Sequence, residues 1–148
     1  MLAQPGPVSV MVDNEVVARH LNDLDDCLQA IDGERPVSVE AMRSDRKTRD
    51  LVLYELQRAI QNLLDLGSHL LADRGKAVSE YSEIFAVLAD EGAIPTELAE
   101  RVRGLAGFRN VIIHDYVDVD LDRVAGFVND RLDDLRDLAR HINRAAQE

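Results

Sequence analysis

Apolar residues recur at intervals of three and four positions along almost the whole chain, and this periodicity is what most constrains its fold. Residues 10–31 show the pattern of one buried stripe on an α-helix, with apolar side chains at Val17, Leu21, Leu24, Leu28 and Ile31. No Asn-Gly or Asp-Gly turn is flanked by alternating apolar residues, and the apolar patch at residues 8–12 is too short and isolated to build a sheet. The sequence therefore predicts an all-α protein.

Cap and breaker residues divide the chain into five predicted helical segments. They cover residues 10–31, 45–73, 80–91, 95–114 and 121–143, and residues 33–39 form a loop. These boundaries rest on residues that typically stop or cap helices, namely Gly33, Pro36, Ser44 or Asp45, Gly75, Ser79, Gly92, Pro95 and Asp120. Short links between the last three segments favour antiparallel neighbours, so we expect an up-and-down four-helix bundle with an additional packed helix. It forms one domain over residues 10–144, after a frayed end at residues 1–9.

The composition excludes several classes of protein. The chain has 148 residues and a formal charge of −11, which argues against diffuse binding of nucleic acid over the whole surface, because phosphates are held by clustered cations. No apolar run approaches the roughly 20 residues of a bilayer span, and no basic residue precedes the apolar patch near the N-terminus, so neither a membrane helix nor a signal peptide is expected. Cys27 is the only cysteine, which excludes an internal disulfide. We therefore expect a cytoplasmic protein with no membrane partner.

Common catalytic motifs are missing from the sequence. The four histidines form neither a His-Glu-x-x-His nor a Glu-x-x-His arrangement, so no metal site is expected. No Gly-rich phosphate loop or Gly-x-Ser-x-Gly elbow occurs, and Cys27 lies on the apolar side of its predicted helix, where it is expected to be an inert core residue. The sequence predicts no cofactor.

A polar set interrupts the apolar run at the end of the fourth predicted helix. At about 100° per residue, Arg103, Gly107, Asn110 and His114 fall within roughly 40° of one another and form one stripe. Arg109 lies about 140° from His114 on an ideal helix. These side chains therefore do not converge within one straight helix, so either the helix ends near His114 or a second chain completes the set.

The segment Arg109-Asn110-x-x-x-His114-x-Tyr116 carries the Arg-x4-His-x-Tyr signature of the HEPN superfamily. Together with the long second helix, the Asp65-Leu66-Gly67-Ser68-His69 element and the closing helix, the chain resembles the HepT-like branch of that superfamily over residues 10–142. A motif of this kind counts only in its expected structural context, and here that context is an all-α chain of fitting length.

The resemblance implies a homodimeric, metal-independent endoribonuclease that acts on RNA, either tRNA or mRNA, as the toxin of a toxin–antitoxin pair. Its antitoxin would be a minimal, MntA-like nucleotidyltransferase that transfers AMP to Tyr116. The resemblance makes Arg109 and His114 catalytic and Asn110 a supporting residue. Further supporting candidates are Arg103, Asp65 and His69.

Elementary chemistry is compatible with these roles. Metal-free RNA cleavage needs a group that takes the proton of the 2′-hydroxyl, one that protonates the leaving oxygen, and a cation near the phosphate. His114 suits proton transfer because an unperturbed imidazole titrates near pH 6.5, and Arg109 suits the phosphate because its planar donors bind two oxygens. A two-fold dimer would supply two copies of each. Gly104 and Gly107 leave room for such a contact along the motif helix.

Each residue of the motif also has an ordinary structural explanation. His114 suits the C-terminal end of a helix, where an imidazolium meets the helix dipole. Arg109 could pair with Asp115 or with a carboxylate of the last helix. Tyr116 could be a packing residue of an amphipathic surface. The same packing role is expected for Tyr54 and Tyr81.

Two further groups of residues allow more than one interpretation. Asp65 and His69 lie four residues apart on one helix face, which is the spacing of an intrahelical pair. The densest basic run is either a solvated helix start or a patch that tracks RNA, and it comprises Arg43, Arg46, Lys47 and Arg49.

Two other functions are compatible with the sequence. In the first, the chain is a non-catalytic nucleotide- or partner-binding subunit of a minimal nucleotidyltransferase, with Arg109 and His114 gripping a nucleotide. The acidic total and the single histidine of the motif favour this alternative. In the second, the bundle is a structural adaptor, and substitution of either residue changes neither activity nor partner binding.

Overall fold

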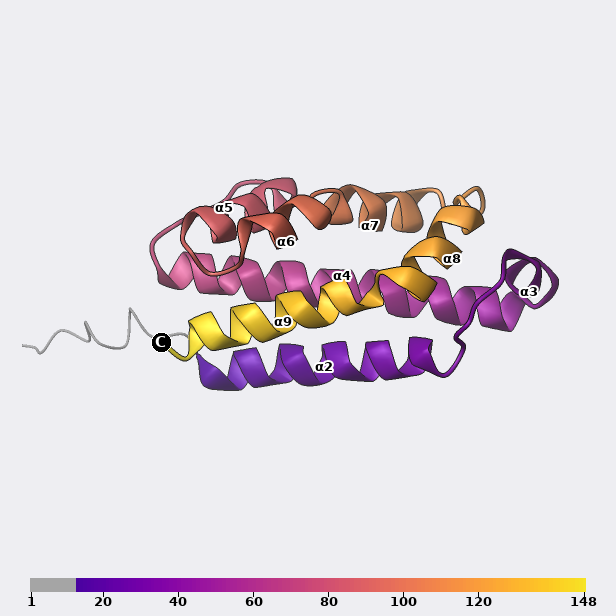
Figure 1. Cartoon of the computed structure of the whole chain (residues 1–148), viewed down its shortest axis with the longest axis horizontal. Coiled ribbons are helices and arrows are strands. Elements are labelled where there is room, and N and C mark those ends of the chain that lie inside the picture. The colour runs from indigo at the N-terminus through magenta and orange to yellow at the C-terminus, as the bar shows by residue number, and fades with distance from the viewer. Residues whose placement is uncertain (1–12) are drawn as a thin grey trace, which may run out of the picture.

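The computed structural model describes residues 13–148, and this part of the chain is helical without a strand, as predicted (Figure 1). The predictions for residues 1–12, including the frayed end, lie outside the described residues. The elements are α2 (Asn14–Asp32), α3 (Val39–Ser44), α4 (Arg46–Asp73), η1 (Tyr81–Glu83), α5 (Ile84–Asp90), α6 (Thr96–Arg101), α7 (Leu105–His114), α8 (Leu121–Asp130) and α9 (Leu132–Ala146).

The helices form an up-and-down four-helix bundle, as the sequence predicts. In Figure 1 the chain passes back and forth along one axis, and the bundle is formed by α2, the long α4, the series α6 and α7, and the pair α8 and α9. The short α5 packs beside them against α4 and α6. Helix α4 is the central element, because it contacts α2, α5, α7 and α9. The short α3 packs at one end against α4 and α8. No helix among residues 13–148 is long and apolar enough to cross a membrane.

Aspartate caps set three of the helix starts. The side chain of Asp45 accepts a hydrogen bond from the backbone of Lys47 at the start of α4, and Asp120 caps α8 through the amides of Asp122 and Arg123. Both caps were predicted, and Asp13 caps α2 in the same way. The predicted cap at Ser79 is wrong, because the next element begins at η1 after Glu80 and has no side-chain cap.

Two predicted helices are each broken in the middle. The segment at 95–114 divides into α6 and α7 at residues 102–104, and the segment at 121–143 divides into α8 and α9 at Arg131. Tertiary packing explains both corners: α6 packs against α5 and α9 whereas α7 packs against α4, and α8 packs against α3 whereas α9 lies along α2 and α4. One straight helix could not reach both sets of neighbours.

A polar contact fixes the corner at Arg131. Its guanidinium donates to the backbone carbonyl of Arg101 and to the carboxylate of Asp134. Arg101 donates to the same carboxylate, so Asp134 joins the two corners. Only 14% of the Asp134 side chain is exposed.

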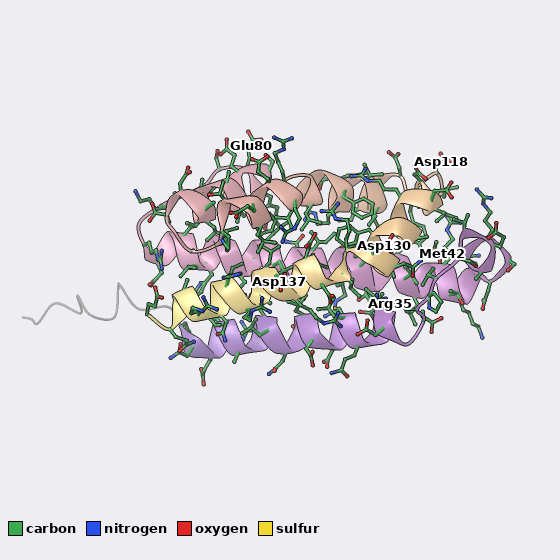
Figure 2. All side chains as sticks on the ribbon, in the orientation of Figure 1. Arg35, Met42, Glu80, Asp118, Asp130 and Asp137 are labelled. Atoms are coloured by element: carbon green, nitrogen blue, oxygen red, sulfur yellow. The ribbon has the colours of Figure 1, made fainter. Side chains whose placement is uncertain are left out.

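The core runs the length of α4, and side chains fill the space between this helix and its neighbours (Figure 2). Its apolar residues are buried along most of the helix, and Gly67 lets α5 approach closely, since a β-carbon there would lie 2.7 Å from Cγ2 of Ile84. Cys27 is fully buried, as predicted. Burial, followed by a hydrogen bond with Glu55, raises the pKa of the Cys27 thiol to about 12, as expected of an inert core residue.

Candidate active site at the end of α7

Arg109 is held from three sides on the face of α7 that points toward α4 and η1. One terminal nitrogen donates to Oε1 of Gln61 and the other to Oδ1 of Asn110. The guanidinium carbon lies 5.2 Å from the centre of the Tyr81 ring. The expected pairing with Asp115 is absent. The guanidinium plane is therefore fixed by neutral side chains, and within residues 13–148 it forms no ion pair with a carboxylate.

Asp65 supports this arrangement from behind. Its Oδ1 accepts hydrogen bonds from Nε2 of Gln61 at 2.8 Å and from the hydroxyl of Tyr81 at 3.0 Å. Because the amide nitrogen of Gln61 donates to Asp65, the amide oxygen is turned toward Arg109. Asp65 is therefore linked to Arg109 indirectly, through Gln61 and Tyr81. We call Gln61, Asp65, Tyr81 and Arg109 the arginine cluster.

Gln61 and Tyr81 were not predicted as members of the site. Tyr81 was expected to be an ordinary packing residue, and this expectation is wrong, because its hydroxyl and ring both serve the arginine cluster. For Gln61 the sequence does hold one signal, a spacing of four residues from Asp65 on α4. The register between α4 and α7 was needed to connect that pair to Arg109.

His69 does not join the cluster. The predicted intrahelical pair with Asp65 is not formed, because both contacts of that carboxylate go to Gln61 and Tyr81. Within residues 13–148, Nε2 of His69 is buried without a hydrogen-bond partner.

The residues of the predicted stripe are open to solvent, but Arg103 lies in the corner before α7 and not on the motif helix as predicted. All four members are exposed, namely Arg103, Gly107, Asn110 and His114. No atom lies within 4 Å of a β-carbon built on Gly107. Arg103 makes only a loose pair with Glu100 at 3.6 Å, in which both side chains are well exposed. The described part of the chain therefore leaves this stripe uncovered.

His114 and Arg109 face different sides of α7. His114 is the last residue of the helix, and in the described residues its ring takes part in no hydrogen bond or ion pair. Arg109 is half-buried against α4 and η1. The lack of convergence predicted from the helix angles is thus confirmed within one chain.

Tyr116 lies beyond the end of α7 and against the start of α4. Its hydroxyl donates to the carboxylate of Asp50, and the guanidinium of Arg49 lies 5.4 Å from its ring centre. Arg49 also donates to the backbone carbonyls of Tyr116 at 2.6 Å and Val117 at 3.1 Å. Burial, followed by the hydrogen bond and the charge of Asp50, raises the pKa of Tyr116 to about 12.

These contacts place the basic run beside the motif. Arg49 is hydrogen-bonded to the Tyr116 segment. The other three cations of the run are exposed, namely Arg43, Arg46 and Lys47. Arg46 pairs loosely with Asp50 at 3.5 Å. The three exposed cations therefore lie at the end of the bundle that also carries Tyr116.

An apolar hollow of about 590 Å³ lies between α4 and α7 next to Tyr116. Its apolar lining comes mainly from Leu51, Leu53, Tyr54, Ile112 and Ile113. Ile113 is 45% exposed and Tyr54 is 55% exposed, so this edge of the motif helix presents unpartnered apolar surface.

The described residues contain no group of three or more His, Cys, Asp or Glu side chains arranged to hold a metal ion. The chemical groups on α7 and just after it are the fixed guanidinium of Arg109, the exposed amide of Asn110 and the exposed imidazole of His114. The phenol of Tyr116, which is hydrogen-bonded to the carboxylate of Asp50, lies beside them.

Comparison with known proteins identifies the family. The family described as ribonuclease HepT-like matches residues 18–142. The mRNA nuclease HepT of Shewanella oneidensis is 24% identical over 127 residues, which cover 82% of this chain and 91% of that protein.

Solved structures show the same fold. A tri-AMPylated HEPN toxin of Shewanella oneidensis in complex with its MNT antitoxin superposes with a TM-score of 0.80 at 22% identity, covering 89% of this chain and 99% of that one. A toxin–antitoxin complex with AMP-PNP gives a TM-score of 0.77 at 21% identity, covering 88% and 99%. From the family match over most of its length, the chain belongs to the ribonuclease HepT-like family.

Proposed function

We propose that this chain is a metal-independent endoribonuclease toxin of a toxin–antitoxin pair, with Arg109 and His114 as catalytic residues. The observation that carries the proposal is the guanidinium of Arg109, which is fixed by Gln61 and Tyr81 without an ion pair in the described part of the chain. It lies on the same short helix as the exposed His114. The nuclease activity named for the Shewanella relative supports it.

The geometry suits Arg109 to a phosphate. A guanidinium has five N–H groups, and Arg109 uses one on each terminal nitrogen for Gln61 and Asn110. Its Nε is buried and has no partner among the described residues, so the donors open to a ligand are the second N–H groups of the two terminal nitrogens. These two donors bind phosphate oxygens and stabilise the charge that grows on them as the 2′-oxygen attacks phosphorus.

His114 carries the proton transfers. Its exposed ring takes the proton of the 2′-hydroxyl or gives one to the leaving 5′-oxygen. A two-fold dimer along α7 brings His114 of one chain next to Arg109 of its partner, so that each of its two sites combines residues from both chains. The open stripe and the bare backbone at Gly107 support a contact along this helix.

Tyr116 is the modification site in this proposal. A nucleotidyltransferase antitoxin positions ATP so that the phenol oxygen attacks the α-phosphorus, pyrophosphate leaves, and the phenol proton passes to the carboxylate of Asp50. The hydrogen bond from Tyr116 to Asp50 supports that route for the proton. The AMPylated Shewanella toxin of the same fold supports the modification. The added phosphate lies beside the exposed cations at the start of α4 and blocks that approach to the motif.

A ribonuclease assay in excess chelator tests the catalytic part. We expect the purified chain to cleave RNA, and we expect His114→Ala and Arg109→Ala to reduce the rate by at least about a hundredfold, the scale of a general acid–base group. His141→Ala is the matched control, because His141 lies on α9. If His114→Ala cleaves as fast as the unchanged chain, the catalytic assignment is wrong.

The same assay separates the alternative function. A chain that cleaves no RNA under any condition but binds a nucleotide through Arg109 and His114 is the non-catalytic subunit of a nucleotidyltransferase.

For the modification, co-expression with an active nucleotidyltransferase is expected to add adenylyl mass to the unchanged chain and to Tyr54→Phe but not to Tyr116→Phe. Label on Tyr116→Phe at the same level would contradict the placement.

A further inference from the structure

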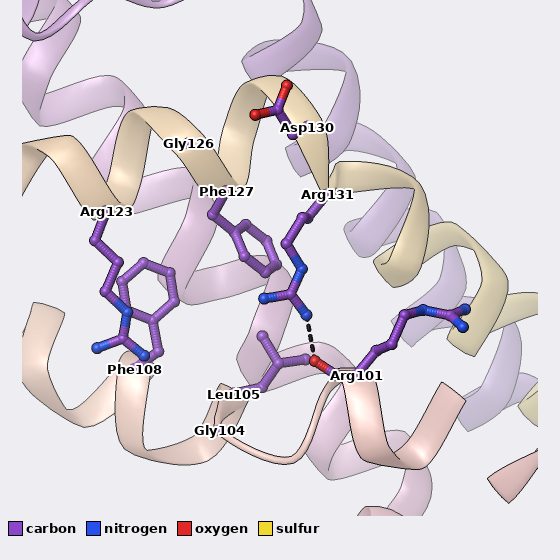
Figure 3. A pocket seen from close by; sticks show the side chains of 9 residues that line it. All are labelled: Arg101, Gly104, Leu105, Phe108, Arg123, Gly126, Phe127, Asp130 and Arg131. Atoms are coloured by element: carbon purple, nitrogen blue, oxygen red, sulfur yellow. Dashed lines mark hydrogen bonds between the residues drawn. The ribbon is translucent and has the colours of Figure 1, made fainter. Parts of the chain in front are cut away.

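A second hollow lies between α7 and α8, outside the arginine cluster (Figure 3). It encloses about 330 Å³, at the lower end of the range for small-ligand pockets. Its floor is formed by the buried apolar side chains of Leu105, Phe108 and Phe127. Three arginines line its sides, namely Arg101, Arg123 and Arg131. Leu105 and Phe108 belong to α7, so the hollow lies along the first half of the helix that ends at His114.

The three arginines are not equivalent. Arg101 and Arg131 share the carboxylate of Asp134 at 3.2 and 3.3 Å, and Arg131 also donates to the carbonyl of Arg101. These two are therefore fixed in the wall of the hollow, and their charge is partly neutralised. Arg123 makes no ion pair within residues 13–148, and its guanidinium lies 4.4 Å from the centre of the Phe108 ring.

The Arg123 guanidinium is thus a flat, charged surface with an aromatic ring behind it. Figure 3 shows it lying across Phe108, while the carboxylate of Asp130 lies at the other end of the hollow. The positive charge is therefore concentrated at the Arg123 end. Nucleic-acid bases stack on arginine planes, and the edges of a guanidinium bind phosphate oxygens.

We propose that this hollow binds one nucleotide of single-stranded RNA next to the cleavage site, with the base stacked on Arg123 and its phosphate held by the same side chain. The amino-bearing edge of a base suits the acceptor at Asp130. The proposal rests on the proposed ribonuclease function and adds a subsite to it. A free nucleoside monophosphate has the same chemistry, so the experiment must distinguish the two sources.

The test measures binding of an RNA hexamer in which 2′-fluorine replaces each 2′-hydroxyl, so that no attacking oxygen is present, and one base is the fluorescent 2-aminopurine. Arg123→Met retains an apolar cover for Phe108 but lacks both the charge and the plane. Arg123→Lys retains the charge alone. Arg19→Met is the matched control, because Arg19 is exposed on α2 and its substitution changes the net charge equally. Circular dichroism checks that each variant is folded.

We expect Arg123→Met to weaken hexamer binding by about tenfold, within the range for loss of one stacked base, and to abolish the quenching of 2-aminopurine. Arg123→Lys is expected to keep the salt dependence of binding but to lose the quenching. Arg19→Met should bind as the unchanged chain does. Free AMP should compete weakly with the hexamer.

Three results would overturn the proposal. The first is equal binding and quenching for Arg123→Met and Arg19→Met. The second is AMP binding that depends on Arg123 while hexamer binding does not, which would make this a free-nucleotide site. The third is loss of nucleotidyltransferase binding by Arg123→Met with hexamer binding intact, which would make it a protein interface.

The cleavage assay separates this inference from the function on which it rests. If the unchanged chain cleaves RNA but Arg123 does not affect hexamer binding, only the subsite is wrong. If hexamer binding depends on Arg123 but no RNA is cleaved, the subsite stands and the proposed ribonuclease function is wrong.

Discussion

Arg109 is oriented by the amide of Gln61 and the ring of Tyr81, and the carboxylate of Asp65 lies one hydrogen bond behind them. A carboxylate in direct contact would fix the guanidinium equally well but would compete with a phosphate for its charge. Gln61 avoids this competition because its oxygen accepts a hydrogen bond without a full negative charge. Asp65 accepts hydrogen bonds from Gln61 and Tyr81 and so holds both in place without contacting Arg109 through a hydrogen bond of its own.

Replacing Gln61 tests this arrangement. Gln61→Met keeps the length of the side chain but removes the acceptor for Arg109. A hydrogen bond to a charged group contributes about 1.5–3 kcal/mol, so RNA cleavage is expected to fall by about ten- to a hundredfold. The melting temperature should change little, because Gln61 is only half-buried.

The matched control is Gln57→Met, one turn earlier on α4, where the side chain makes no hydrogen bond within residues 13–148. It should cleave RNA at the unchanged rate. Equal rates for the two variants would show that Gln61 does not position Arg109.

The phenol of Tyr116 gives a pH-dependent prediction. Tyrosine ionises near pH 10 in an unfolded chain, whereas the folded-state pKa of Tyr116 is raised to about 12. The folded chain therefore holds this proton more tightly. The resulting stabilisation is complete below about pH 10 and is lost as the pH rises toward about 12.

An ultraviolet titration of tyrosinate measures this shift. The chain has three tyrosines, and one ionisation step should occur at clearly higher pH than is usual for tyrosine. Tyr116→Phe should remove this late step, and Tyr54→Phe should leave it in place. A late step that persists in Tyr116→Phe would contradict the assignment.

Residue types at fixed spacing predicted part of the site and missed the rest. The shared face of Gly107, Asn110 and His114 depends only on helix geometry within α7, and these residues are exposed in the structure. Arg103 lies outside this helix, because the break at residues 102–104 was not predicted. The partners of Arg109 lie 48 residues away at Gln61 and on the separate element η1. Such contacts depend on how α4, η1 and α7 pack, which helix periodicity does not specify.

Helix boundaries, too, were predictable only where they depend on residues close together in the sequence. The starts of α4 and α8 were predictable, because Asp45 and Asp120 cap them through residues two or three positions away. The corners at residues 102–104 and at Arg131 were not. Each arises because the flanking helices pack against different neighbours, and the contact that fixes Arg131 to Arg101 spans 30 residues.

The approach of α5 to α4 depends on Gly67. A β-carbon at this position would lie 2.7 Å from Cγ2 of Ile84 and 3.0 Å from Cδ1 of Leu88. The methyl group of Ile84 is attached to a branched carbon, so it moves only if the rotamer or the backbone changes. Overpacking of this kind costs about 1–3 kcal/mol, which exceeds the gain of about 1 kcal/mol from placing Ala in a helix.

Gly67→Ala is therefore expected to lower the melting temperature by a few degrees, as measured by circular dichroism. Gly126→Ala on α8 is the control, because no atom lies within 4 Å of a β-carbon there and only the gain in helix propensity remains. The two substitutions should shift stability in opposite directions. A higher melting temperature for both Gly67→Ala and Gly126→Ala would mean that α5 can move away from α4 without a loss of stability.

For the molecule as a whole, the net charge of −11 does not describe the surface that would meet RNA. Arg43, Arg46 and Lys47 are exposed at the end of the bundle that holds Tyr116. A local cationic surface attracts phosphates even on an acidic protein, because charges beyond about 10 Å are screened at moderate salt.

The outward-facing His114 leads to a prediction about the assembly. If a two-fold dimer pairs Arg109 of one chain with His114 of the other, a cleavage site requires both subunits. Arg109→Ala and His114→Ala should each be inactive alone. In a mixed dimer, one of the two sites would lose both residues and the other would keep both.

Mixing the two inactive variants under conditions that exchange subunits should therefore restore cleavage. About half of the dimers are mixed and each has one intact site of two, so the expected rate is about a quarter of that of the unchanged chain. If each chain carried its own complete site, every site in the mixture would lack one residue and no activity would return. A sedimentation measurement on the mixture must show dimers, because a strictly monomeric chain that cleaves RNA would exclude a shared site whatever the mixing result.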